Sequence, residues 1–297
     1  VVKSKAAKMV EVYGNNYFMI GPYFVSQAIG QFQEELPNEI CKSVFEELKK
    51  IGIICHFGRW LIEGSPFVIL IDFVNYTPRI NEIKRELWDW YKVDSLRAPA
   101  DYNEPVAWAY AAGILIEKLS SCYKDKKIVA HFHEWLSGAG LLYLKKKDAK
   151  IAAAFTTHAT VLGRTLANSN IDLYNVWNKI NPDTEVYKYS VEAKHFIEKN
   201  CAAFADVFTT VSEITGMEAS YLLKKKPDTI LPNGLDMGKF PTFEEIAIGH
   251  RLQRDRIREF MLYYFFPYHT FDLKETLIYF IAGRYEFHDK GIDIFIT

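Results

Sequence analysis

The sequence has few cysteines, almost no net charge and no long hydrophobic run. Its four cysteines stand far apart, without the spacing of a zinc site or a disulfide framework: Cys41, Cys55, Cys122 and Cys201. The formal net charge of -1 argues against nucleic acid or an anionic membrane as a partner. No apolar run approaches the roughly 20 residues that span a bilayer, and the first residues do not resemble a signal peptide. We therefore expect a cytoplasmic protein with reduced thiols.

Common nucleophile and phosphate motifs are also missing. The chain has no GxSxG sequence, and no spacing links Ser, His and an acid as a hydrolase triad requires. Neither a Walker A loop nor a GxGxxG fingerprint occurs. The sequence therefore argues against triad hydrolysis, and any phosphate site has to rest on other residues.

Short apolar runs alternate with helical patterns over most of the chain, which is typical of an α/β protein with a parallel sheet. With 297 residues, 49% of them hydrophobic, the chain is long enough for one large domain and part of a second. The predicted strands are 17–20, 53–57, 67–72, 128–132, 151–156, 207–211 and 229–231. The predicted helices are 40–50, 105–121, 191–204 and 214–224.

The pattern changes after Asn233. Residues 243–265 predict a charged amphipathic helix, and residues 276–282 predict a buried strand that runs into Gly283 and Arg284. We expect three parts, listed in chain order: a first Rossmann-like domain at 1–233, a hinge and interdomain helix at 234–275, and the start of a second, nucleotide-binding Rossmann-like domain at 276–297. Val1 is not a start methionine, and a helix has just begun where the chain stops, so both ends look like cuts.

Polar residues gather where predicted strands end, which is the edge at which open α/β sheets bind ligands. His133 and Glu134 follow one strand, and His158 follows the next. In one interpretation His133 and Glu134 recognise sugar hydroxyls; in another, Glu134 caps a helix and His133 is merely buried. A metal pair of His131 and His133 is a third interpretation, but no further ligand is near in sequence.

Arg284 and Lys290 lie between Gly283 and Gly291 at a predicted strand-to-helix junction. Backbone N–H groups, a helix dipole and two cations can converge on phosphate in such a place. The alternative is two solvated cations on a turn. The strand-glycine-arginine context favours a diphosphate site.

Eight short segments carry a resemblance to a known family. They are VVKSKA at 1–6, NYFMIGP at 16–22, GRWLIEG at 58–64, AHFHEWL at 130–136, FTTHAT at 155–160, FTTVS at 208–212, LPNGL at 231–235 and IAGRYEF at 281–287. In this order they resemble glycogen synthases of the eukaryotic, UDP-glucose-using type, glycosyltransferase family 3. The similarity covers nearly the whole chain.

The resemblance implies a GT-B fold, in which two Rossmann-like domains face a cleft that binds donor and acceptor. The implied reaction transfers glucose from UDP-glucose to the non-reducing 4-OH of an α-1,4-glucan, with retained configuration and without a metal or other cofactor. By matching motif, His133 contacts the glucose or the acceptor, and Arg284 and Lys290 neutralise the departing diphosphate, so these three are the expected catalytic residues. The expected substrate-binding residues are Arg284, Lys290, His133, Glu134, His158 and Asn233.

The resemblance also implies what lies outside the chain. The family's first strand and Gly-rich donor loop would precede Val1, and its catalytic glutamate would follow Thr297. We therefore expect residues 1–297 alone to be inactive, to bind UDP-glucose weakly and to self-associate through unpaired strand edges. Glycogenin is a partner by analogy, and the full-length protein is expected to form a homo-oligomer. Another GT-B sugar-nucleotide transferase and a non-catalytic glucan-binding protein remain the alternatives.

Overall fold

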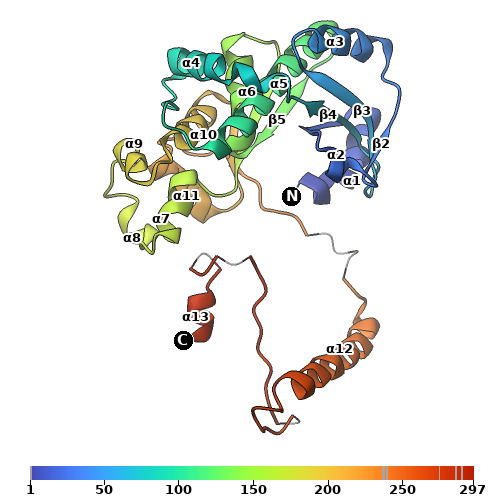
Figure 1. The fold of residues 1–297 in the computed structure, drawn as a ribbon, viewed down its shortest axis with the longest axis vertical. Coiled ribbons are helices and arrows are strands. Elements are labelled where there is room, and N and C mark those ends of the chain that lie inside the picture. The colour runs from blue at the N-terminus through green and yellow to red at the C-terminus, as the bar shows by residue number, and fades with distance from the viewer. Residues whose placement is uncertain (1, 236–237, 239, 274, 285, 289) are drawn as a thin grey trace. The chain divides into compact units, whose positions relative to one another are not determined.

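The computed structural model describes residues 2–235, 238, 240–273, 275–284, 286–288 and 290–297. Its internal contacts divide the chain into two units, Val1–Asn233 and Gly234–Thr297, which we describe separately. Figure 1 follows the chain through its elements by colour. The assignment of the two units to two Rossmann-like domains joined by a hinge stays a prediction.

The first unit contains two four-stranded sheets, with the strand orders β1-β4-β3-β2 in sheet A and β5-β6-β7-β8 in sheet B. Sheet A consists of β1 (Phe18–Pro22), β2 (Phe32–Glu34), β3 (Ile54–Trp60) and β4 (Phe67–Asp72). Sheet B consists of β5 (Val129–His133), β6 (Ala152–Thr157), β7 (Val207–Thr210) and β8 (Thr229–Ile230). The sequence predicts each of these strands except the short β2.

Sheet A is mixed, so the expectation of parallel strands throughout is wrong there. Strand β1 runs parallel to β4, whereas β3 is antiparallel to both β4 and β2. The cause is the short connection at 61–66 between β3 and β4. Parallel neighbours need a crossover of a dozen or more residues, so this loop closes a hairpin instead.

Sheet B is parallel throughout, as expected. Its strands alternate with helices that return the chain to the starting edge of the sheet. Because the strands point the same way, their carboxyl ends meet at one edge, where His133 pairs with Thr156 and Thr157 pairs with Thr210. The residues after these strands are therefore brought together by the fold.

Helices pack around both sheets of the first unit. They are α1 (Val2–Tyr13), α2 (Val25–Ala28), α3 (Glu39–Lys49), α4 (Ile80–Tyr91), α5 (Ala100–Cys122), α6 (Glu134–Lys146), α7 (Val161–Asn168), α8 (Leu173–Val176), α9 (Pro182–Glu185), α10 (Glu192–Phe204) and α11 (Glu213–Leu222). Short 3-10 helices are η1 (Gly14–Asn16), η2 (Thr77–Arg79) and η3 (Val186–Tyr189). The predictions of α3, α5, α10 and α11 are confirmed, and α3 packs against β3 (Figure 1).

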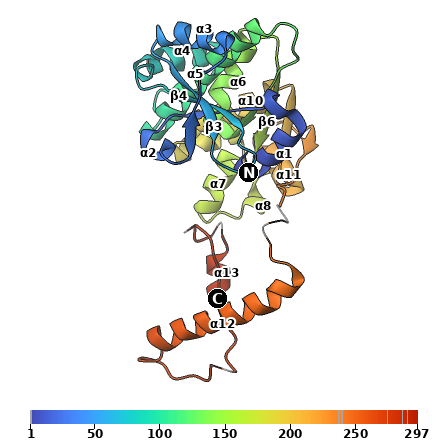
Figure 2. The same cartoon turned by 90° about the vertical axis from the view of Figure 1, so that its right-hand side faces the viewer.

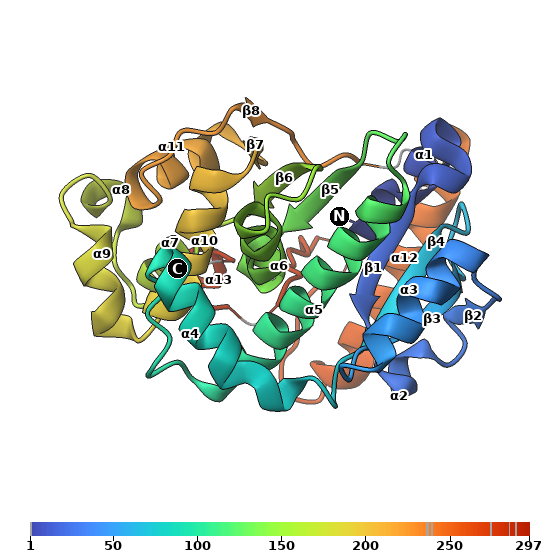
Figure 3. The same ribbon diagram turned by 90° about the horizontal axis from the view of Figure 1, so that it is seen from above.

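The main core is continuous through the first unit, from α3, β3 and β4 to sheet B and helices α5, α6 and α10. Phe132, Phe155 and Phe208, one from each of β5, β6 and β7, are buried in it. Helices α5 and α6 run alongside each other (Figure 3) and meet at Gly113 and Gly140. A Cβ atom on Gly140 would lie 2.5 Å from the carbonyl oxygen of Ala109, so only glycine permits this approach.

A smaller apolar cluster joins α7, α8, η3 and α11. Figure 2 shows α7, α8 and α11 in the same part of the first unit. Its fully buried members include Leu162, Leu166 and Leu222. This cluster fixes α7, the helix that follows the loop after β6, and so contributes to the placement of that loop.

The second unit contains α12 (Phe243–Tyr264) and α13 (Ile292–Ile296). Helix α12 confirms the predicted helix and begins with a capping box between Thr242 and Glu245, but it buries none of its residues, so no apolar face is packed. The predicted strand at 276–282 is wrong for this structure: no described residue pairs with it, and the side chain of Phe280 is 77% exposed. An apolar segment forms a strand only where a neighbour accepts and donates its backbone hydrogen bonds.

Candidate functional site

The junction of β5 and α6 carries the first predicted pair. His133 is the last residue of β5, and Glu134 is the first residue of α6. Glu134 has a positive φ of 62°, a conformation that non-glycine residues rarely adopt. Its carboxylate does not cap its own helix. Instead, Oε1 accepts a hydrogen bond from the backbone N–H of His158 at 2.9 Å, which ties the end of β5 to the end of β6.

Three glutamate side chains from three helices hold the loop between β6 and α7 and the first residue of α7. Each accepts one backbone N–H: Glu134 of α6 from His158 at 2.9 Å, Glu218 of α11 from Thr160 at 2.8 Å, and Glu198 of α10 from Val161 at 2.8 Å. Burial raises the pKa of all three, that of Glu198 to about 8. Gly163 is necessary here, because a Cβ on it would lie 2.3 Å from Oε1 of Glu218.

His133 lies at the centre of a polar cluster of the first unit. Its Nε2 is 3.3 Å from Nζ of Lys5 on α1, and its Nδ1 is 3.4 Å from Nε2 of His158. Its ring also stacks on that of His131, with 4.2 Å between centroids. Burial, reinforced by His131 and Lys5, lowers the pKa of His133 to about 3. His133 is therefore a neutral imidazole near pH 7.

His131 takes part in a different chain of hydrogen bonds. Its Nε2 is 2.7 Å from Oγ1 of Thr156, which is 2.6 Å from Oγ1 of Thr209. The Thr209 hydroxyl donates to the carbonyl oxygen of Phe155. This series of hydrogen bonds crosses β5, β6 and β7 on the face opposite the buried phenylalanines. A metal pair of His131 and His133 gains no support, because no group of three or more potential ligands is arranged for a metal within the described ranges.

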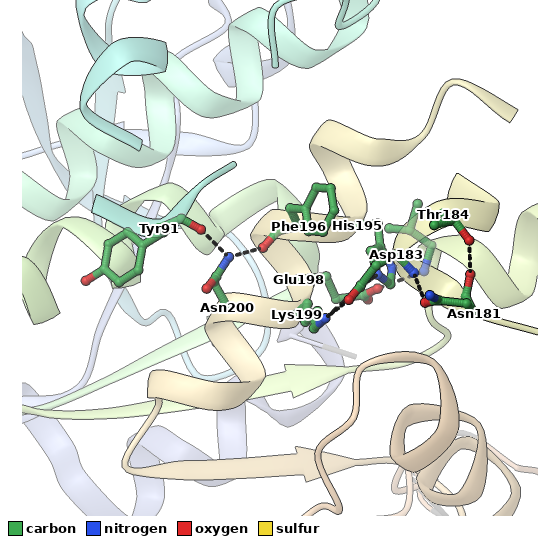
Figure 4. A network of polar contacts seen from close by, with 10 residues as sticks. Tyr91, Asn181, Asp183, Thr184, His195, Phe196, Glu198, Lys199 and Asn200 are labelled. Atoms are coloured by element: carbon green, nitrogen blue, oxygen red, sulfur yellow. Dashed lines mark hydrogen bonds and ion pairs between the residues drawn. The ribbon is translucent and has the colours of Figure 1, made fainter. Parts of the chain in front are cut away.

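Helix α10, which supplies Glu198 to the segment after β6, also takes part in a second polar network (Figure 4). Next to Glu198, Lys199 forms an ion pair with Asp183 of α9, with 2.6 Å to each carboxylate oxygen. His195 is fully buried, and its Nε2 lies 3.7 Å from Asp183. Burial lowers the pKa of His195 to about 4, so its ring is neutral. The network anchors the helix that supplies Glu198.

The second unit carries the other predicted pair. Nη2 of Arg284 lies 3.1 Å from Oε1 of Glu286, and Nζ of Lys290 lies 3.3 Å from Oε2 of the same carboxylate. The two cations therefore meet on one anionic group. Asn233 lies in an exposed coil segment of the first unit and joins neither cluster.

The structure thus groups the predicted residues into two sets, His133, Glu134 and His158 in one and Arg284 and Lys290 in the other. Sequence reasoning missed Lys5, Glu198, Glu218 and Glu286. A signal existed for two of them, because Glu198 and Glu218 interrupt the buried faces of α10 and α11. A carboxylate in such a position is rarely left without a structural or chemical role.

Sheet B, with parallel strands and a polar cluster at their carboxyl ends, makes the first unit an α/β fold, a class in which ligands commonly bind at this edge. A family model described as glycogen synthase matches residues 1–297. The chain belongs to the glycogen synthase family.

Curated relatives agree with this assignment over the whole chain. The chain is 40% identical to the glycogen (starch) synthase of Dictyostelium discoideum. It is 39% identical to the liver glycogen (starch) synthase of Homo sapiens and 38% identical to the glycogen (starch) synthase of Neurospora crassa. It covers 34% of the first and 42% of the other two, and thus about a third to two fifths of their length. Among solved structures, the chain matches the catalytic domain of starch synthase IV from Arabidopsis thaliana bound to ADP and acarbose. The match has a TM-score of 0.33 and 14% sequence identity, and it covers 74% of this chain and 52% of that one.

No helix in the described part of the chain combines the length and apolar character needed to cross a membrane. The four cysteines are free thiols, Cys41 and Cys201 being buried.

Proposed function

We propose that the protein to which this chain belongs transfers glucose from UDP-glucose to the non-reducing 4-OH of an α-1,4-glucan, with retention of configuration and on a GT-B scaffold. The observation that carries the proposal is the match of the whole chain to the glycogen synthase family, together with its curated relatives. Because the chain spans less than half of these relatives, the activity is assigned to the complete protein.

His133 and His158 supply the sugar contacts in this proposal. Both lie at the carboxyl edge of a parallel sheet, and both are held by neighbours rather than free to rotate. Neutral imidazoles suit this role. The ring nitrogens of His133 face Lys5 and His158, so His133 meets the sugar with its ring, whereas His158 keeps one nitrogen for a sugar hydroxyl. A ring fixed before the substrate arrives loses less entropy on binding.

Arg284 and Lys290 neutralise the diphosphate that leaves with uridine. Their shared contact with Glu286 supports this role, because two cations that reach one carboxylate can also reach one phosphate group. Negative charge on the diphosphate grows as the glycosidic bond breaks. Cations at this position therefore stabilise the transition state more than the ground state.

The test is transfer of labelled glucose from UDP-glucose to glycogen by the complete protein. Arg284→Ala and Lys290→Ala should each lower kcat/KM. The loss should correspond to about 2 to 4 kcal/mol of transition-state stabilisation. Arg254→Ala, which removes an exposed cation of α12, serves as the control and should leave transfer unchanged. Near-wild-type turnover of both site variants would contradict the diphosphate role, and a preference for another sugar nucleotide would contradict the donor.

Other expectations remain predictions: transfer without a metal or other cofactor, glycogenin as a partner, a homo-oligomer and a cytoplasmic location. The first is checked by assaying transfer after treatment with a chelator, which should leave the rate unchanged. The oligomeric state is checked by light scattering on the complete protein.

A further inference from the structure

Lys5 is the one cation of α1 whose side chain contacts the histidine cluster within the described residues. It is half-buried, and its Nζ lies 3.3 Å from Nε2 of His133. An ammonium group has three hydrogens and no lone pair, so it can only donate a hydrogen bond. The Nε2 atom of His133 must therefore be the acceptor.

The proton of the neutral His133 ring then has a fixed place. With Nε2 accepting, Nδ1 carries the hydrogen, and Nδ1 lies 3.4 Å from Nε2 of His158. His133 donates to His158, whose Nε2 is the acceptor. Burial also lowers the pKa of His158, so this ring is neutral as well and carries its own hydrogen on Nδ1.

We propose that Lys5 is a positioning residue which, through His133, fixes the tautomer of His158 so that its Nδ1–H is offered to a substrate hydroxyl. The inference rests on the proposed function for its substrate, a sugar donor, but its structural content does not depend on that function. The backbone of His158 is held independently by Glu134. Lys5 therefore governs which ring nitrogen donates and leaves the position of the loop to the glutamates.

His131 provides an internal reference. The Thr209 hydroxyl donates to the carbonyl of Phe155, so it accepts from Thr156, and Thr156 in turn accepts from Nε2 of His131. His131 is thus the Nε2–H tautomer. Two stacked rings are fixed in opposite tautomers by different partners, Lys5 for His133 and the threonine pair for His131.

The experiment is solid-state nitrogen NMR of sedimented protein labelled with 15N-histidine, in which protonated and bare ring nitrogens resonate at well-separated shifts. Variants His131→Gln, His133→Gln and His158→Gln assign the signals. Wild-type His133 and His158 should be protonated on Nδ1. Lys5→Met should leave a mixture of tautomers in both rings, whereas Lys5→Arg, another obligate donor, should restore the wild-type pattern.

Thr209→Val is the matched control, since it should release the tautomer of His131 and leave His133 and His158 unchanged. A wild-type His158 protonated on Nε2, or a Lys5→Met spectrum identical to wild type, would overturn the proposal. A thermal melt of each variant verifies that it is folded, so a changed spectrum reports the rings and not a loss of structure.

Kinetics separate this inference from the proposed function. In the complete protein, Lys5→Met should lower kcat/KM for UDP-glucose about tenfold, and Lys5→Arg should recover most of the loss. Tautomers that respond as expected in a protein without glucose transfer would support the Lys5 assignment and reject the function. If the protein transfers glucose but Lys5→Met leaves the tautomers unchanged, the function would be supported and the Lys5 assignment rejected.

Discussion

The two units of the chain use similar apolar segments with opposite results. In the first unit, Phe155 on β6 is fully buried between a sheet and a helical layer. In the second, Phe280 lies in an apolar run of similar length, yet its side chain is 77% exposed. Apolar pattern alone therefore does not make a strand, because burial requires partners elsewhere in the chain. The following comparisons test whether the difference is energetic as well as geometric.

The largest effect is expected from removing a buried ring. Phe155→Ala should lower the free energy of unfolding of the first unit by about 3 to 5 kcal/mol, since it leaves a cavity in the core. Phe280→Ala should change it by less than about 0.5 kcal/mol. Tryptophan fluorescence during urea unfolding is a selective probe, because all six tryptophans lie within residues 1–233. Equal midpoints for both variants would contradict the comparison.

A second effect concerns the buried carboxylate Glu198. Burial raises its pKa from an ordinary 4.5 to about 8, so the folded state holds a proton that the unfolded chain releases. The free energy of unfolding should therefore fall as pH rises between these values, by about 1.4 kcal/mol per pH unit for one proton. Glu198→Gln should remove this part of the decline.

The measurement for Glu198 is urea unfolding between about pH 5 and about pH 8, followed by the same tryptophan fluorescence. Glu134 and Glu218 also have raised pKa values and remain in the variant, so the difference between the two slopes isolates Glu198. Glu244→Gln, at an exposed position of α12, is the control from the second unit and should leave the wild-type slope unchanged. Identical slopes for Glu198→Gln and wild type would show that Glu198 is already ionised in the fold.

The smallest effect comes from one added methyl group. Gly140→Ala should destabilise the first unit by about 1 to 3 kcal/mol, because the new Cβ would meet the backbone of α5. Gly249→Ala in α12 meets no atom within 4 Å, so it should strengthen the helix by about 1 kcal/mol. Urea unfolding checks the first change and circular dichroism checks the second. Destabilisation by both would mean that α12 is packed in solution.

Local patterns in the sequence predict every described strand except β2, and the helices α3, α5, α10, α11 and α12. They miss α1, α4 and α6, which are of similar length. The position of Pro105 misled the prediction of α5, which begins at Ala100 and carries this proline inside it. The hairpin of β3 and β4 was missed because direction depends on loop length rather than on apolar pattern. In each case the local signal was correct about the type of element, and the surrounding structure decided its extent or direction.

The candidate site was predictable only in part. His133, Glu134 and His158 follow strands, so strand order alone brings them together. Lys5 could not be placed, since its contact with His133 joins residues 128 positions apart. The roles of Arg284 and Lys290 rest on the resemblance, and their common partner Glu286 has no pattern that marks it in advance.

The loop from His158 to Val161 should behave unlike other loops in hydrogen exchange. Its amides at His158, Thr160 and Val161 are bonded to glutamate side chains from three separate helices, so none of them can meet solvent unless it leaves a buried partner. Loop amides usually exchange through local fluctuations at little free-energy cost. These three should instead exchange as slowly as the amides of the sheet core, so that the segment carrying His158 opens only when the fold itself opens.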